Sequence, residues 1–193
     1  MQRLRVMVID ESREFAQVLS DGLSRSGHEV VSTLSSMRDL IGNVETCVPD
    51  VIIVSTDSPS RDSLEHICVV SRDRPRPIVM FSNDKETETI QAAVRAGVTA
   101  YVVDGLEAAR IQAIVDVAVA RFSEYQAMRN ELAKTKSAMA DRKSIDRAKG
   151  ILMKQRQCDE DEAFQALRKL AMDRNIRLGE AAEQVINVAK MLR

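Results

Sequence analysis

Acidic and hydroxyl side chains follow several short apolar runs of the sequence, and such side chains can bind a divalent cation or accept a phosphoryl group. Asp10 and Glu11 come directly after the apolar residues 6–9, and carboxylate oxygens are ligands that Mg²⁺ prefers. The alternative is that this pair only begins a loop and caps the next helix. The candidate residues of this kind are Asp10, Glu11, Ser55, Asp57, Ser82 and Asp104. Because the three cysteines are far apart and no glycine-rich phosphate loop is present, we predict no functional metal and no other cofactor.

A second set of candidate residues is basic and lies in the C-terminal third of the chain. Residues 130–157 contain eight Lys and Arg side chains against three Asp and Glu. Lys and Arg on one face of a helix can bind the phosphates of a nucleic acid. The alternative is a helix face that is simply solvated, which composition alone favours. Composition also gives no choice between DNA and RNA.

The first 121 residues alternate short β-branched runs with segments of helical periodicity. This alternation predicts a five-stranded parallel sheet covered by helices on both faces, with any ligand at the carboxyl ends of the strands. The predicted strands are residues 6–9, 29–33, 51–54, 78–81 and 101–103. The candidate acidic and hydroxyl residues should therefore gather at one edge of this sheet.

The third strand and its surroundings resemble a response-regulator receiver domain, which has a flavodoxin-like α/β fold. The resemblance rests on the five-strand pattern, the acidic pair at Asp10 and the run of residues 49–59, PDVIIVSTDSP. It implies that Ser55 occupies the position of the phosphate-accepting Asp and that Asp104 occupies the position of a Lys. A serine hydroxyl without an adjacent base is a poor nucleophile, and Asp104 would repel a phosphate. We therefore predict that residues 1–121 form a pseudo-receiver that is controlled by binding rather than by phosphorylation.

A long helix is predicted to follow the receiver-like part. No Pro occurs from residue 106 to residue 156, and the first Gly after residue 106 is Gly150. Apolar residues recur at near-heptad spacing along it, which predicts a coiled-coil linker over residues 122–141 and a homodimer. The predicted dimer residues are Ala118, Phe122, Tyr125, Met128, Leu132 and Met139. Arg129 and Lys136 interrupt the second apolar stripe, so a helix packed only on its own receiver is the alternative.

Residues 142–193 are predicted to form a bundle of three amphipathic helices. The first is the end of the long helix, with Ile145, Leu152 and Met153 turned toward the bundle core. The second begins after Asp159, which with Glu162 forms a capping-box pattern. The third begins near Gly179.

The first of these helices carries a second resemblance. Residues 142–153, RKSIDRAKGILM, and the segment that begins DEDEAF at Asp159 resemble an ANTAR domain. Together with the receiver-like part, the chain resembles the ANTAR-domain response-regulator family of transcription antiterminators, the NasT and AmiR type, and its NasT branch most. The resemblance implies RNA contacts by Arg142, Lys143, Arg147, Lys149, Gly150, Lys154 and Arg156. Gly150 would allow close approach of the backbone, unless it serves helix packing.

The same resemblance predicts a function. It implies a regulator that binds a two-hairpin leader RNA, prevents termination, and is held inactive by a nitrate- or nitrite-sensing protein of the NasS type. The predicted target genes are those of nitrate or nitrite assimilation. The apolar run near the N-terminus is too short for a signal peptide or membrane span, which predicts a cytoplasmic protein. No nucleophile–base pair stands out, so we predict no catalytic residue and no enzymatic activity.

Two other functions remain open from the sequence. One is a DNA-binding response regulator controlled by phosphorylation, which would need an acceptor Asp and a separate recognition helix. The other is a protein-interaction scaffold whose basic face docks an acidic partner.

Overall fold

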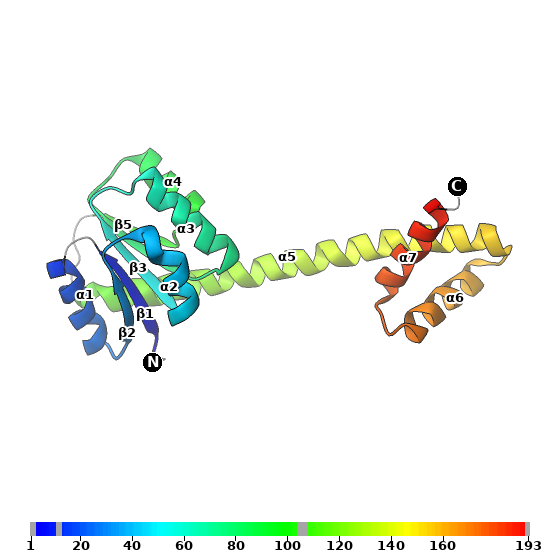
Figure 1. The fold of residues 1–193 in the computed structure, drawn as a ribbon, viewed down its shortest axis with the longest axis horizontal. Coiled ribbons are helices and arrows are strands. Elements are labelled where there is room, and N and C mark those ends of the chain that lie inside the picture. Colours follow the sequence, from blue (N-terminus) through cyan, green and yellow to red (C-terminus); the bar gives the residue numbers. More distant parts are fainter. Residues whose placement is uncertain (1–2, 11–12, 104–107, 192–193) are drawn as a thin grey trace. The chain divides into compact units, whose positions relative to one another are not determined.

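The computed structural model describes residues 3–10, 13–103 and 108–191. The chain divides into two compact units, Met1–Gln126 and Ala127–Arg193 (Figure 1). No helix in the described ranges is both long and apolar enough to cross a membrane.

The first unit contains a five-stranded parallel sheet in the order β2-β1-β3-β4-β5. Its strands are β1 (Arg5–Asp10), β2 (Glu29–Leu34), β3 (Val51–Thr56), β4 (Ile78–Ser82) and β5 (Ala100–Val103). The predicted fold class and all five predicted strands are confirmed. The strands extend a residue or two beyond the apolar runs. In β3, for example, Ser55 and Thr56 still pair with β4.

Helices cover both faces of this sheet, as the buried apolar runs require. The helices of this unit are α1 (Arg13–Arg25), the short η1 (Met37–Asp39), α2 (Leu40–Cys47), α3 (Arg61–Asp73), α4 (Thr87–Ala96) and the start of α5 (Ala108–Arg156). One core joins the sheet to α1 and α5, and includes Leu19, Ile111 and Val115. The other joins the opposite face to α2, α3 and α4, and includes Leu40 and Ile67.

The predicted long helix is confirmed as α5, which is continuous from Ala108 to Arg156. One residue assigned above to the dimer stripe lies elsewhere: Ala118 is fully buried in the core between α5 and the sheet. It packs against its own unit and is unavailable to a partner helix, which corrects that assignment. Phe122 is half-buried. The four remaining stripe residues are 55–61% exposed: Tyr125, Met128, Leu132 and Met139.

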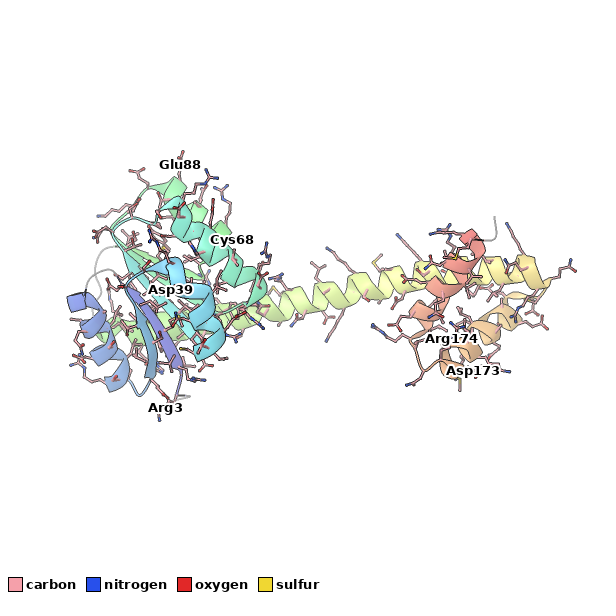
Figure 2. All side chains as sticks on the ribbon, in the orientation of Figure 1. Arg3, Asp39, Cys68, Glu88, Asp173 and Arg174 are labelled. Atoms are coloured by element: carbon pink, nitrogen blue, oxygen red, sulfur yellow. The ribbon has the colours of Figure 1, made fainter. Side chains whose placement is uncertain are left out.

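The second unit is a bundle of the end of α5 with α6 (Glu160–Asp173) and α7 (Leu178–Met191), as predicted. Its aliphatic core includes Ala148, Leu152, Leu167 and Ile186. The capping box at the start of α6 is also confirmed, because Asp159 accepts from the N–H of Glu162 and the Glu162 side chain accepts from the N–H of Asp159. Arg174, labelled in Figure 2 at the end of α6, donates to Gln184 and so joins α6 to α7.

Candidate nucleic-acid interface

Several of the acidic and hydroxyl residues lie together at the carboxyl edge of the sheet. Asp10 and Ser55 are directly paired across β1 and β3, and Thr56 is paired with Ser82 across β3 and β4. Asp10 and Ser82 are buried, each 6% exposed, and Ser55 is half-buried. The structure therefore brings Asp10, Ser55 and Ser82 to one place. Glu11 and Asp104 lie outside the described residues.

Asp57 directly follows β3 and is hydrogen-bonded to Ser82, the last residue of β4, and to Asn83, which follows it. Its carboxylate is exposed and accepts a hydrogen bond from the Asn83 amide at 2.9 Å, and the Ser82 hydroxyl donates to its backbone carbonyl, also at 2.9 Å. Next to it, the Ser58 hydroxyl donates to Asp84 at 2.6 Å, which lowers the pKa of the Asp84 carboxyl. Across the described ranges, no group of three or more His, Cys, Asp or Glu side chains is placed to hold a metal ion.

The end of α5 has two faces. Ala148 and Leu152 are buried in the bundle core, and Ile145 and Met153 pack against it from the same helix. Outside this core the end of α5 is exposed and basic, because five cations are open to solvent: Arg142, Lys143, Arg147, Lys154 and Arg156. The division into an inward apolar face and an outward basic face follows directly from the 3.6-residue period of a helix.

Lys149 differs from these five cations because its charge is engaged within the bundle. Its side chain is only 17% exposed, and its ammonium lies 2.9 Å from Asp146 and 2.7 Å from Glu160. Hydrogen bonds to Glu160 and Asp146 raise the pKa of Lys149, and the hydrogen bond from Lys149 lowers the pKa of Asp146. Lys149 therefore links α5 to the first turn of α6.

Two glycines of the bundle have opposite surroundings. A Cβ added at Gly150 would meet no atom within 4 Å, so no close helix contact in the structure requires a glycine there. A Cβ added at Gly179, at the start of α7, would overlap the carboxylate of Asp141 on α5. Gly179 therefore allows the close approach of α7 to α5.

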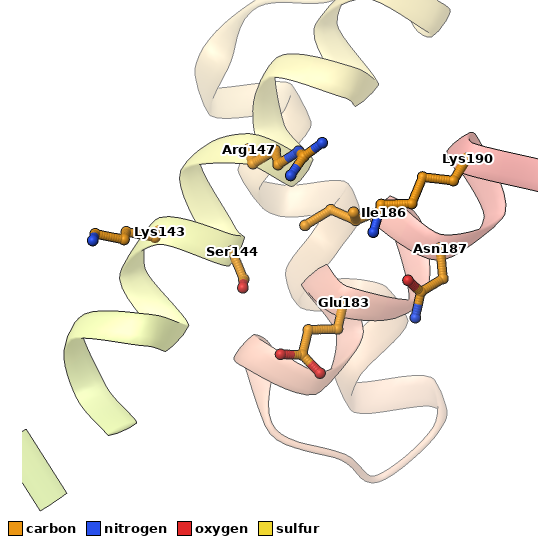
Figure 3. A pocket seen from close by; sticks show the side chains of 7 residues that line it. All are labelled: Lys143, Ser144, Arg147, Glu183, Ile186, Asn187 and Lys190. Carbon is orange, nitrogen blue, oxygen red and sulfur yellow. The ribbon is translucent and has the colours of Figure 1, made fainter. Parts of the chain in front are cut away.

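A hollow of about 300 Å³ lies between α5 and α7. Figure 3 shows Arg147 reaching from α5 toward Ile186 and Lys190, with Ser144 facing α7, whereas Lys143 points away from α7. A second hollow of about 230 Å³ shares Arg147, Ile186 and Lys190 and continues to Lys154. The residues that line the first hollow are Lys143, Ser144, Arg147, Glu183, Ile186, Asn187 and Lys190.

The basic residues predicted from the sequence all lie on α5, so the α7 side of these hollows was not predicted. Glu183, Asn187 and Lys190 are spaced i, i+4 and i+7, so they share one face of α7. That spacing was readable from the sequence. This spacing points to a binding surface only once α7 is known to lie beside the basic end of α5.

Comparison with known families gives one match in each part of the chain. Residues 6–116 match the response regulator receiver domain, and residues 133–186 match the ANTAR domain. The receiver match covers more than half of the chain. The fold agrees with solved receivers such as the signal receiver domain of a modulated diguanylate cyclase from Desulfovibrio desulfuricans G20, with a TM-score of 0.57 and 18% identity over 64% of this chain and 99% of that one.

Two curated relatives match different lengths of the chain. The transcriptional regulatory protein PdtaR of Mycobacterium tuberculosis is 27% identical over 94% of this chain and 89% of its own length. The nitrate regulatory protein of Klebsiella oxytoca is 41% identical over 70 residues, which are 36% of this chain and 18% of that protein. The first similarity therefore spans both units, and the second spans a limited segment.

Proposed function

The chain belongs to the response-regulator family, with a receiver domain followed by an ANTAR domain, and from this membership we propose that it is a transcription antiterminator that binds RNA through the ANTAR part. The family is regulatory rather than enzymatic, in agreement with the prediction from the sequence. We assign residues 1–121 to control, residues 122–141 to a dimerising linker and residues 142–193 to RNA binding.

The observation that carries this proposal is the basic surface of the ANTAR part. Five cations on α5 are exposed, and three of them, Lys143, Arg147 and Lys154, line the two hollows together with Lys190 of α7. Phosphate contacts supply a large share of the affinity of nucleic-acid binding. The proposed RNA contacts are Arg142, Lys143, Arg147, Lys154, Arg156 and the backbone at Gly150. Lys149 would contribute to RNA binding mainly by holding α6 on α5.

The residues at the carboxyl edge of the sheet give little support to control by phosphorylation. Ser55 stands beside the buried Asp10 where the receiver resemblance places a phosphate acceptor, and Asp57 is tied to Asn83. We therefore propose a pseudo-receiver in the cytoplasm whose ANTAR part is released when a protein partner dissociates. Dimerisation through α5 would then present two ANTAR parts to two RNA hairpins.

The proposed signal is nitrate or nitrite, sensed by a NasS-like protein that sequesters this chain. Support comes from the resemblance to the NasT type and from the 41% identity to a segment of a nitrate regulatory protein. The proposed targets are leader RNAs of nitrate or nitrite assimilation genes, in which binding two hairpins prevents formation of a terminator.

The central experiment compares RNA with DNA. The full chain is titrated against a two-hairpin RNA from the leader of a nitrate assimilation operon and against duplex DNA of the same sequence, over a series of salt concentrations. We expect preference for the RNA. Arg147→Ala should lower affinity and reduce the slope of log K against log salt by about one, since one phosphate contact is lost.

Lys169→Ala is the matched control, because Lys169 is an exposed cation of α6 in the same bundle that lines neither hollow between α5 and α7. It should leave the salt slope unchanged. Equal affinity of the wild-type chain for duplex DNA would contradict the proposal and favour a DNA-binding regulator.

A further inference from the structure

A groove lies between α6 and the turn into α7, and we call it the α6 groove. Its volume is about 430 Å³, larger than either hollow between α5 and α7. Phe164, Arg168 and Met172 line it from α6, Asn175 and Ile176 line it from the turn, and Leu178 lines it from the start of α7. No residue lines both this groove and a hollow between α5 and α7, so the α6 groove is a separate surface of the bundle.

The α6 groove exposes apolar side chains that the bundle core leaves uncovered. Met172 is 71% exposed, and Phe164, Ile176 and Leu178 are half-buried. Apolar side chains that are left together at a surface mark interaction sites. Met172 suits such a surface because an unbranched methionine side chain can adapt its shape to a partner.

The kinds of residue in the α6 groove favour a protein ligand over a nucleic acid. Phe, Met and Arg are enriched where proteins bind one another, whereas Lys and Glu are depleted there. The lining of the α6 groove includes Phe164, Arg168 and Met172 and contains no Lys or Glu. The larger hollow between α5 and α7, in contrast, is lined by Lys143, Lys190 and Glu183 among others.

The charge around the α6 groove favours an acidic ligand. Residues 164–178, which include all the residues that line it, contain four Lys and Arg against one Asp. The charge stays positive even though Arg177 is paired with Glu180. Arg168 is the one charged side chain among the residues that line the groove, and a guanidinium can bind a carboxylate through two parallel hydrogen bonds.

We propose that the α6 groove binds an acidic amphipathic helix of a protein partner, which packs apolar side chains on Phe164 and Met172 and presents a carboxylate to Arg168. A helix fits because Phe164, Arg168 and Met172 are spaced four residues apart, and such a row of side chains packs into the surface of a second helix. This partner is additional to the proposed nitrate sensor. It leaves the hollows between α5 and α7 open, so the protein can bind it and RNA at the same time.

A phage-displayed library of helical peptides, randomised along one face, tests this proposal. The full-length wild type, Met172→Gln and Arg168→Glu each select from the library, and the selected peptides are sequenced and titrated against each protein. Wild type should select peptides with apolar residues at helical spacing and Asp or Glu beside them. Met172→Gln should bind these peptides about tenfold more weakly, the loss expected for an interface anchor. Arg168→Glu should select Lys or Arg instead, because the charge that faces the peptide is reversed.

Lys169→Glu is the matched control, because Lys169 is the neighbouring exposed cation of α6 and does not line the groove. It should select the same acidic peptides as wild type. Circular dichroism checks that each variant remains helical. The proposal is overturned if wild type enriches no peptide, or if Met172→Gln binds the selected peptides as tightly as wild type does.

The same variants distinguish two other ligands of the groove. Weaker binding of hairpin RNA by Met172→Gln would assign the groove to RNA, and weaker self-association in sedimentation analysis would assign it to a second copy of the chain. Either result would overturn the partner helix. Failure of wild type to bind hairpin RNA would overturn the proposed function alone, because the peptide selection does not require RNA.

Discussion

The ammonium of Lys149 lies 2.7 Å from Oε1 of Glu160, so a side chain on α5 is bonded to the first turn of α6. Asp146, one turn earlier on α5, lies 2.9 Å from the same ammonium. The three residues form a small network that fixes where α6 begins relative to α5. The resemblance to the ANTAR domain implied that Lys149 contacts RNA. The network gives Lys149 a second role, which is to hold α6 on α5, and the two roles can be tested separately.

Lys149→Ala and Glu160→Gln distinguish these roles. If Lys149 positions α6, both variants should lower the Tm slightly and reduce RNA affinity by similar factors, because both break the same bond. If Lys149 contacts RNA directly, Glu160→Gln should leave affinity unchanged or raise it, since a negative charge is removed. Lys169→Ala, an exposed cation of α6, controls for the loss of charge. Thermal unfolding and RNA titration supply the two measurements.

The same network predicts a pH dependence of stability. The pKa of Asp146 is lowered by the hydrogen bond from Lys149, so its folded pKa lies below its unfolded pKa. Its contribution is therefore complete above the ordinary carboxyl pKa, about 4, and is lost as the pH falls through the lowered value. Wild type should lose more stability than Asp146→Asn over this acidic range in thermal unfolding. Parallel loss in both proteins would argue against the effect.

Gly150 and Gly179 should respond to alanine with opposite signs. Gly150→Ala adds a methyl group in open space and should stabilise the chain by about 0.5–1 kcal/mol through helix propensity. Gly179→Ala should destabilise it by about 1–2 kcal/mol, because crowding against Asp141 outweighs that gain. Denaturant unfolding measures both. The double variant Gly179→Ala/Asp141→Ala should recover most of the loss, and no recovery would place the strain elsewhere.

Gly150→Ala also tests close approach of RNA to the backbone. The added methyl group should lower RNA affinity, because it would hold the RNA away from the helix backbone. The protein should become more stable at the same time, since no packing contact in the structure requires a glycine there. A stabilised variant with unchanged affinity would remove Gly150 from the proposed interface.

The exposed apolar residues of α5 should hold two copies together. Leu132 and Met139 are 55% and 60% exposed and seven residues apart, so they lie on one face of the helix. Leu132→Lys/Met139→Lys should convert a dimer into a monomer in sedimentation analysis. Asn130→Lys adds a charge to the same exposed stretch and should leave the dimer intact. A wild-type chain that remains monomeric at all concentrations tested would contradict the dimer.

The receiver domain should not respond to a phosphoryl donor. Ser55 lacks the nucleophilicity of a carboxylate, and Asp57 is bonded to Asn83. Incubation with acetyl phosphate and Mg²⁺ should therefore leave the intact mass and the RNA affinity unchanged. A gain of one phosphoryl group that disappears in Asp57→Asn would identify Asp57 as an acceptor and restore control by phosphorylation.

The fold was largely predictable because its signals are local. Apolar runs such as Ile52 and Ile53 in β3 identify buried strands, and the Asp159–Glu162 pattern marks the start of α6 without knowledge of distant residues. The buried position of Ala118 was missed for a complementary reason. Heptad spacing describes a helix face, but it does not tell whether the chain's own sheet or a second helix covers that face.

The candidate site was less predictable because it is formed by residues of different helices that pack against one another. Lys149 meets Glu160 only because the chain reverses between α5 and α6, where Gln157 adopts a left-handed conformation with φ of 53°. No Gly or Pro lies between the two helices to mark that turn in the sequence. The hollow likewise joins residues of α5 to Asn187, about forty positions later, and no spacing rule within either helix connects them.

The contact between Gly179 and Asp141 limits how this surface can evolve. Because a Cβ at position 179 would meet the Asp141 carboxylate, a larger residue there requires the Asp141 side chain to turn aside or to be replaced. Substitutions at positions 141 and 179 are therefore expected to occur together in descendants of this protein rather than one at a time.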